Sequence, residues 1–292
     1  MDEELRRQAI ALYDRFTHEG MERRDFFAAM TRIAGGAAAA NLLIGSIAAS
    51  PAAAAIVPAN DKRLRTGMTT IRAGGAAPYK TYVAEPRATG VKRGSVLVIH
   101  ENRGLNDHIR DVARRLALAG YVAVAPDLLT PSGGTPADED AARTAIGKLD
   151  LGAATAAGVA MLERLRARKD SNGKVGAVGF CWGGAFVDRL AVAAGPKLTA
   201  GVAYYGPAPD PSEAKRVEAP LLLHYAGLDD RVNASGKPWV AALKAAGKKV
   251  DSFTYAGVNH AFNNDTSAER YNKAAADLAW KRTLAFFKRH LG

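Results

Sequence analysis

The only cysteine in this 292-residue chain lies in a sequence setting that suits a nucleophile. Cys181 follows an apolar run from Lys174 to Phe180 and stands between Gly179 and Gly183. A strand, a Gly-x-Cys-x-Gly turn and a helix form a nucleophile elbow, which presents the central side chain at the carboxyl edge of a sheet. N–H groups at the start of the following helix stabilise anions, including a thiolate or an oxyanion. We therefore interpret Cys181 as a nucleophile and not as an inert buried thiol.

Two later segments supply an acid and a base for this nucleophile. Asp229 and Asp230 follow an apolar strand near Tyr225, and His260 follows a later strand that ends near Tyr255. Nucleophile, acid and histidine, each just past a strand, follow the chain order of α/β-hydrolases. Taken singly, the acids could lie in a solvated turn and the histidine could be an ordinary loop residue. The ordered set predicts a Cys-His-Asp triad.

The elements that would position these residues alternate regularly from Asp61 onward. We expect strands over Thr69–Ala73, Tyr79–Ala84, Ser95–His100, Tyr121–Pro126, Lys174–Phe180, Ala200–Tyr205, Pro220–Tyr225 and Asp251–Tyr255. We expect helices over Asp107–Ala119, Glu139–Arg168, Gly184–Ala194, Ala234–Ala246 and Ala268–His290. This alternation predicts an α/β fold with a mostly parallel eight-stranded sheet and helices on both faces. The first two strands, joined by a short Gly-Gly-Ala-Ala-Pro connection, should be the antiparallel exception.

Five motifs carry a resemblance to a known family. They are His100-Glu-Asn-Arg-Gly-Leu, Tyr121-Val-Ala-Val-Ala-Pro-Asp, Gly179-Phe-Cys-Trp-Gly-Gly, Gly227-Leu-Asp-Asp-Arg-Val and Asn259-His-Ala-Phe. From about Thr69 to the C-terminus the chain resembles the dienelactone hydrolase family of α/β-hydrolases. The resemblance implies Cys181 as the nucleophile, His260 as the general base and Asp229 as the orienting acid. The spacing to the following valine favours Asp229 over Asp230.

The resemblance also implies roles around the first central strand. Glu101 takes the place of a glutamate that contacts the resting thiol; a loop ion pair with Arg103 or a nearby lysine is the alternative. The backbone N–H groups of Asn102 and Trp182 are assigned to the oxyanion hole. In family members that act on dienelactone, arginines bind the carboxylate of the substrate. The corresponding stretches of this chain, after Asp127 and after His260, have no arginine close by. Either Arg103 replaces them, or the substrate lacks a carboxylate.

Together these features predict a hydrolase that cleaves a lactone or small carboxylic ester through a thioester, without cofactor or metal. An acyltransferase using the same acyl-enzyme and a non-catalytic ligand-binding protein are the alternatives, and a redox-sensing thiol is a third. The single cysteine excludes an internal disulfide and the multi-cysteine zinc and iron–sulfur sites.

The chain is basic, with a formal net charge of +11. Its lysines and arginines do not gather into a tract, and none of the common nucleic-acid-binding motifs is recognisable. We therefore expect a small-molecule substrate and no nucleic-acid partner. The oligomeric state is not predicted.

Residues 1–60 differ in character from the predicted catalytic domain, residues 61–292. A polar helix is expected over Met1–Glu22, and Arg23-Arg24-Asp-Phe-Phe opens a mildly apolar run to Ala49. This pattern resembles a twin-arginine export signal cleaved after Ala55, which predicts a periplasmic or otherwise exported protein. The acidic leader and Arg32 argue against it; the alternative is a helical extension that stays packed on a cytoplasmic protein. The run is too polar for a stable membrane anchor.

Overall fold

A single eight-stranded sheet forms the centre of the molecule, with strand order β1-β2-β4-β3-β5-β6-β7-β8. The computed structural model describes residues 3–48, 55–73 and 78–292. The strands are β1 (Leu64–Ile71), β2 (Tyr79–Pro86), β3 (Arg93–Ile99), β4 (Val122–Pro126), β5 (Ser171–Phe180), β6 (Ala200–Tyr204), β7 (Leu221–Ala226) and β8 (Val250–Tyr255). β2 pairs antiparallel with β1 and β4, and the other pairs are parallel. The predicted mostly parallel sheet is confirmed.

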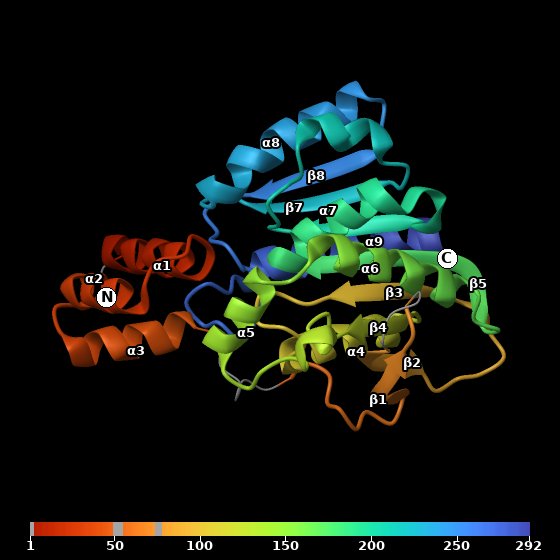
Figure 1. Cartoon of the computed structure of the whole chain (residues 1–292), viewed down its shortest axis with the longest axis horizontal. Coiled ribbons are helices and arrows are strands. Elements are labelled where there is room, and N and C mark those ends of the chain that lie inside the picture. The colour runs from red at the N-terminus through yellow and green to blue at the C-terminus, as the bar shows by residue number, and fades with distance from the viewer. Residues whose placement is uncertain (1–2, 49–54, 74–77) are drawn as a thin grey trace.

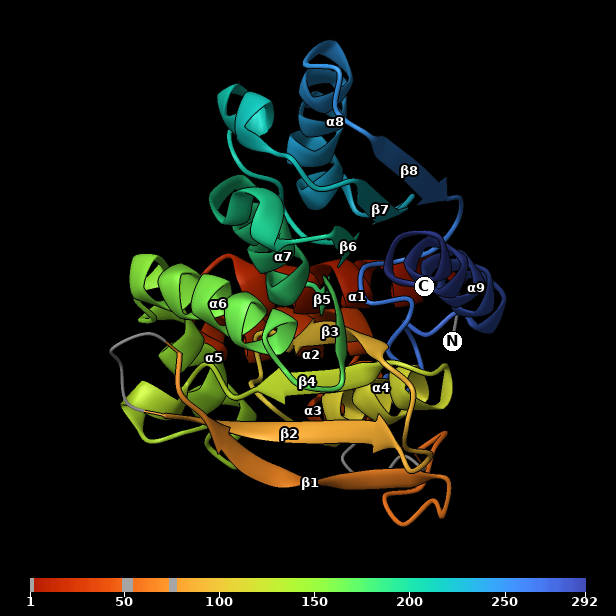
Figure 2. The same cartoon turned by 90° about the vertical axis from the view of Figure 1, so that its right-hand side faces the viewer.

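Helices cover both faces of this sheet. The helices of the described residues are α1 (Glu3–His18), α2 (Arg23–Ala34), α3 (Ala37–Ile47), α4 (Asp107–Leu118), α5 (Glu139–Gly147), α6 (Leu151–Arg166), α7 (Trp182–Ala194), α8 (Asp230–Ala245) and α9 (Lys273–Leu291), with short 3-10 turns η1 (Thr130–Ser132), η2 (Gly195–Lys197) and η3 (Pro211–Arg216). α4 and α9 lie on one face, and α6, α7 and α8 on the other (Figure 2). Each face buries its own apolar cluster against the strands.

Three predicted helices have different boundaries in the structure, and side-chain caps explain the differences. The expected helix over Glu139–Arg168 is two helices, α5 and α6, because the Asp150 side chain accepts the Ala153 N–H and starts a new helix. α8 starts at Asp230, earlier than expected, because Asp229 caps it. α9 starts later than expected, at Lys273, where Asn272 is the cap.

The central strands end together at one edge of the sheet. β3, β6 and β7 are almost wholly buried, so they read in the sequence as continuous apolar runs. The loops that follow β3, β5, β7 and β8 carry the predicted site residues. Functional groups of open α/β sheets gather at this edge.

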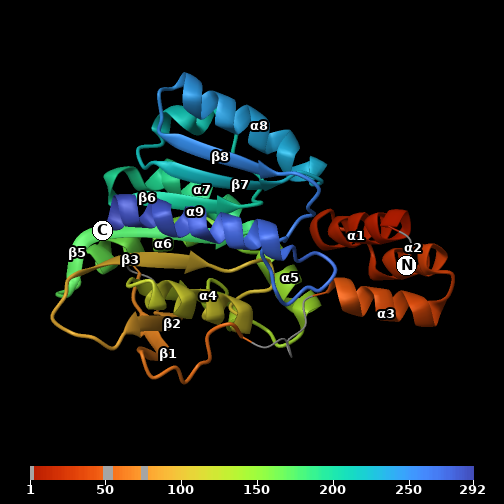
Figure 3. The same cartoon turned by 180° about the vertical axis from the view of Figure 1, so that it is seen from behind.

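The N-terminal helices stand against the same edge. α1, α2 and α3 form a group of their own beyond the carboxyl ends of the strands (Figures 1 and 3). Their apolar side chains make a separate cluster that includes Ile10, Phe16, Phe26 and Met30. This is the geometry of a packed helical extension. Export remains a prediction, because residues 49–54, with most of the small-residue stretch before the expected cleavage point, lie outside the described residues.

Two further predictions concern the connection between the first two strands and a membrane anchor. The connection between β1 and β2 falls on residues 74–77, which also lie outside the described residues. Within the described ranges, no helix by itself has the length and apolar character to cross a membrane. The bent pairs α2 with α3, at 105°, and α5 with α6, at 95°, meet those criteria only when joined.

Candidate active site

Cys181 occupies a nucleophile elbow between β5 and α7. Its backbone has φ 54° and ψ −119°, a conformation that L-residues rarely adopt and that costs about 1–3 kcal/mol. A Cβ on Gly179 would lie 2.0 Å from the Gly183 carbonyl oxygen, and one on Gly183 would lie 2.5 Å from the His100 carbonyl oxygen. Both glycines are therefore required by close backbone contact. The predicted strand-turn-helix elbow is present.

Asp229 and His260 form a buried pair beside this elbow. His260 Nδ1 lies 2.6 Å from Asp229 Oδ2, and the other carboxylate oxygen accepts the Val232 N–H at 3.2 Å. Asp230 is exposed at the first position of α8. The structure therefore pairs the histidine with Asp229 and not with its neighbour. The carboxylate fixes the ring so that Nε2 faces the elbow.

The electrostatics of this pair favour a charged imidazole at His260. Burial by itself lowers the pKa of His260, but the negative charges of Cys181 and Asp229 outweigh it and raise the pKa to about 10. Burial raises the pKa of Asp229, and the nearby His260 more than reverses this, so the net pKa is lowered. Asp229 and His260 thus stabilise each other's charged forms.

Glu101 is buried in the same site but has a different partner from the one that the resemblance implies. Its Oε2 accepts a hydrogen bond from Asn264 Nδ2 at 2.9 Å. The hydrogen-bond partner of Cys181 Sγ is His18, at 3.1 Å from its Nε2. The alternative ion pair with Arg103 is not formed either, since that guanidinium pairs with Glu139 at 3.2 Å.

The two residues assigned to the oxyanion hole flank the sulfur. Trp182 is the first residue of α7, where a helix leaves its N–H without an intrahelical partner. Its indole stacks on the His100 ring with centroids 5.6 Å apart, and His100 accepts the Leu128 N–H. Asn102 follows Glu101 in the adjacent loop, and its side-chain amide donates to the Thr17 carbonyl at 3.3 Å.

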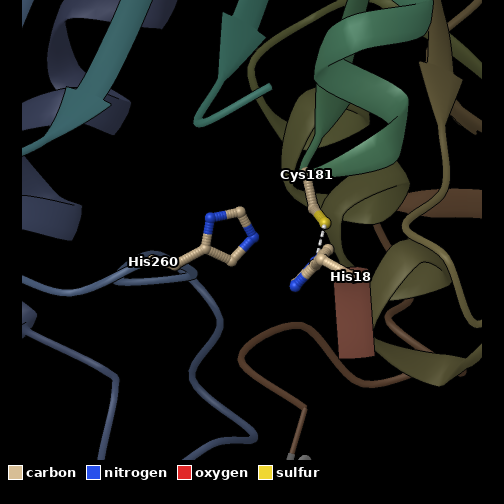
Figure 4. A group of neighbouring side chains, drawn as sticks. All are labelled: His18, Cys181 and His260. Carbon is tan, nitrogen blue, oxygen red and sulfur yellow. Dashed lines mark hydrogen bonds between the residues drawn. The ribbon is translucent and has the colours of Figure 1, made fainter. Parts of the chain in front are cut away.

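His18 is a site residue that the sequence analysis did not predict. It lies in the last turn of α1, and Figure 4 shows its ring against the sulfur of Cys181, with the His260 ring beside both. The two imidazole rings meet edge to face, with centroids 4.8 Å apart. Burial and the charge of His260 hold the pKa of His18 well below its usual range, so this ring is neutral. The one indication in the sequence was the apolar stripe of α1, which predicts that this helix packs against another part of the protein.

With α1 in place, the site is closed. The remaining cavity has a volume of about 10 Å³, no more than one water needs. It is lined by Thr17, His18, Glu101, Asn102, Arg103, Cys181, His260, Ala261 and Arg270. A lactone or ester cannot enter while α1 is docked.

Two arginines reach this cavity, and both contact α1. Arg103, the predicted substrate ligand, donates to the Tyr13 hydroxyl. Arg270 lies 3.5 Å from Asp14 Oδ1 and is stacked over the Tyr13 ring. Sequence reasoning missed Arg270 because it lies beyond the stretch that immediately follows His260. The site therefore contains two cationic side chains, although neither lies in the stretches that directly follow Asp127 and His260.

A cysteine at an elbow on a mostly parallel eight-stranded sheet, with a histidine held by an acid from the next loops, defines an α/β-hydrolase. The sequence comparison narrows this class. Residues 79–291 match the dienelactone hydrolase family, and the chain belongs to that family. α1–α3 lie outside the matched region.

Individual relatives agree with this assignment. A protein from Escherichia coli (strain K12) named as a carboxymethylenebutenolidase is 34% identical over 260 residues, covering 84% of this chain and 94% of that protein. One of the same name from Saccharolobus solfataricus is 31% identical, covering 73% and 95%. The crystal structure of a protein from Klebsiella pneumoniae, titled as a dienelactone hydrolase, has a TM-score of 0.71 at 29% identity, covering 78% of this chain and 99% of that one. The predicted family and its hydrolase class are confirmed.

Proposed function

We propose that this protein hydrolyses a lactone or small carboxylic ester through a thioester on Cys181. The observation that carries the proposal is the buried Asp229–His260 pair, 2.6 Å between the bonded atoms, aimed at a sulfur on a strained elbow. A nucleophile, a base and an orienting acid in this relation perform acyl transfer on several unrelated folds. The relatives named as carboxymethylenebutenolidases support the lactone as the substrate class.

In the first half-reaction the Cys181 thiolate adds to the carbonyl carbon, and the carbonyl electrons move to oxygen. The N–H groups of Asn102 and Trp182 stabilise that oxyanion. When the tetrahedral adduct collapses, the bond to the leaving oxygen breaks and His260 gives its Nε2 proton to the alkoxide. A thioester and a neutral imidazole remain, and Asp229 holds the ring in position throughout.

In the second half-reaction His260 removes a proton from water as the oxygen adds to the thioester. The second tetrahedral adduct expels the sulfur as a thiolate and leaves a carboxylic acid. The imidazolium formed in this step restores the starting ion pair, so protons and electrons balance over the cycle. Neither half-reaction requires a metal or a cofactor.

Arg103 and Arg270 favour a substrate that carries a carboxylate. Both guanidiniums line the cavity around Cys181, and both contact α1. Asp14 gives Arg270 a carboxylate partner from α1, as an anionic substrate would. When α1 is displaced, the two arginines become available to fix a carboxylate beside the sulfur.

Turnover then requires α1–α3 to leave the site. In the proposed cycle these helices are displaced before substrate binds, by movement or by removal. The arginine pair of the twin-arginine pattern supports removal during export, because the side chains of Arg23 and Arg24 are 78% and 94% exposed. Cleavage after Ala55 would take His18 away from the sulfur.

The proposal is tested by assaying the full chain and a chain that begins at Ile56 against carboxylated and neutral lactones and short-chain nitrophenyl esters. The shorter chain keeps the Val57 N–H on Asp111 at 2.8 Å and both sheet-face clusters. We expect Cys181→Ala to lower kcat/KM by about 10⁴-fold or more in the shorter chain. Equal rates with and without the thiol would contradict the proposal.

A further inference from the structure

Two imidazoles and one thiol converge in one small enclosed cavity, and a triad accounts for only one of the imidazoles. The ligating atoms of His18, Cys181 and His260 all lie within 4.8 Å of one another (Figure 4). We propose that these three side chains form a binding site for a divalent transition-metal ion of the Zn²⁺ type, complete only while α1 is docked. Sequence analysis predicted no metal site, because the third ligand comes from a segment treated there as a leader.

The distances suit a tetrahedral ion after small side-chain movements. Zn²⁺ binds sulfur at about 2.3 Å and imidazole nitrogen at about 2.0–2.1 Å, which separates neighbouring ligand atoms by about 3.3–3.6 Å. His18 Nε2 and Cys181 Sγ are 3.1 Å apart, slightly closer than this. The widest separation within the group, up to 4.8 Å, would have to shorten by about 1.2–1.5 Å. Torsions about the side chains of His18 and Cys181 can supply both changes.

Both imidazoles are already oriented as metal ligands are. A ligating histidine usually donates its other ring N–H to a carbonyl or carboxylate, which fixes the tautomer. His18 Nδ1 lies 2.8 Å from the Asp14 carbonyl oxygen, and His260 Nδ1 lies 2.6 Å from Asp229 Oδ2. In each ring the Nε2 atom is the one left to face the sulfur.

One of these nitrogens is left without a partner. His260 is 2% exposed, and among the described residues its Nε2 has no hydrogen-bond partner within bonding geometry. The sulfur is already hydrogen-bonded to His18 at 3.1 Å. A single cation would accept a lone pair from each of the three atoms, and the one proton that Cys181 and His260 carry between them would leave to solvent. The buried nitrogen would then be satisfied.

The donor set selects the type of ion. Thiolate and imidazole ligands favour Zn²⁺ and its neighbours in the transition series, whereas Mg²⁺ and Ca²⁺ require oxygen ligands. Three protein ligands leave a fourth position for water, and the cavity of about 10 Å³ admits no substrate there. An ion at this place would bind the sulfur and the base together and tie α1 to the body. It would act as an inhibitor that stabilises the closed form.

The experiment is a Co²⁺ titration of the reduced, metal-free full chain, because tetrahedral Co²⁺ bound to a thiolate has a sulfur-to-metal charge-transfer band and intense visible bands. We expect one Co²⁺ per chain, displaced by Zn²⁺ but not by Mg²⁺. His18→Ala should weaken binding more than about 100-fold. His290→Ala is the matched control: it removes a histidine near the C-terminal end, opposite α1–α3 (Figure 1), and should bind as the natural chain does.

Cys181→Ser should abolish the charge-transfer band and serves as a second variant if His18→Ala disturbs the docking of α1. X-ray absorption of the natural chain with bound Zn²⁺ tests the ligand set without any substitution, and one sulfur with two imidazoles is expected. No stoichiometric binding, equal binding by His18→Ala, or a bound ion without a sulfur ligand would overturn the proposal. Metal binding is measured without turnover, so failure of the proposed hydrolysis would leave this result intact.

Discussion

The α/β body and the N-terminal helices differ in how they are held. Inside the body, apolar side chains from strands and helices pack into two large clusters on the faces of the sheet. α1–α3 have a cluster of their own, and they meet the body largely through polar groups. A cavity of about 590 Å³ also lies between these helices and residues 137–140. The body is therefore a packed unit, whereas the helices rest on its carboxyl edge.

Two exposed ion pairs join the two regions at the surface. Arg6 pairs with Glu269 at 2.6 Å, and Arg23 pairs with Asp140 at 2.5 Å, all of them partly or fully solvent-exposed. Exposed pairs of this kind contribute about 0–1 kcal/mol each and weaken with salt. Ser267 adds a buried hydrogen bond to the Ile47 carbonyl at 2.6 Å. The comparison indicates that the body contains the chemistry and the helices control access to it.

The largest effect should come from the triad acid, which tests the body alone. In the chain that begins at Ile56, Asp229→Asn should lower kcat by about 10⁴-fold, because the amide no longer holds the imidazole in the required tautomer. Asp230→Asn is the matched control, since that neighbouring side chain is exposed, and its kcat should change little. Steady-state assays of the two variants decide the assignment. Comparable losses in both would remove Asp229 from its proposed role.

The second prediction concerns Asp188 and whether burial in the α/β body keeps its carboxyl uncharged. It is fully buried on α7, and burial raises its pKa to about 7 from an ordinary value of 3.8. Below about pH 4 the carboxyl is protonated in both states. Between about pH 4 and pH 7 the unfolded chain ionises first and the body loses stability, by about 4 kcal/mol at most; above pH 7 the loss is constant.

Asp188→Asn should remove this pH dependence. Relative to the natural chain, its free energy of unfolding should rise by a few kcal/mol between pH 4 and pH 8. Urea unfolding at several pH values measures the difference. A difference that does not change with pH would show that the carboxyl is not held in its neutral form.

Removing α1–α3 should raise the activity, because these helices close the site while the α/β body performs the reaction. The chain that begins at Ile56 should have a kcat/KM at least about tenfold above that of the full chain, which corresponds to about 1.4 kcal/mol of preference for the closed form. Both chains are compared on the same lactone at low salt. A shorter chain that folds but is no more active would mean that α1–α3 do not restrict access.

Salt should produce the smallest effect. Because exposed ion pairs join the two regions, raising the ionic strength should activate the full chain by a few-fold and leave the shorter chain unchanged. Rates at increasing sodium chloride concentration measure this. Equal responses of the two chains would assign the effect to the body and not to the contacts of Arg6 and Arg23.

The body could be predicted from the sequence largely because its determinants are local. Buried parallel strands read as apolar runs, and the glycines around Cys181 mark a turn that only small residues allow. The order of Cys181, Asp229 and His260 added the triad. The division of the predicted Glu139–Arg168 helix also has a local cause, the Asp150 cap, which the prediction did not include.

The closure of the site could not be predicted, since it depends on contacts between distant segments. His18 and Cys181 are separated by 163 positions, and nothing in the sequence of α1 specifies where its end will dock. Asn264 and Arg270 lie in the irregular segment between β8 and α9, where no repeating pattern indicates which side chains point inward. Their partners, Glu101 and α1, became evident only from the fold.

The central claim is that Cys181 carries the acyl group in a site that α1 closes. Intact-protein mass spectrometry, followed by peptide mapping, should be applied to the chain that begins at Ile56 and to the full chain, each mixed with a slowly hydrolysed ester and quenched in acid. The account predicts one acyl group on the Cys181 peptide of the shorter chain, much less on the full chain, and none after Cys181→Ala. An acyl group on another residue, or equal labelling of the two chains, would contradict it.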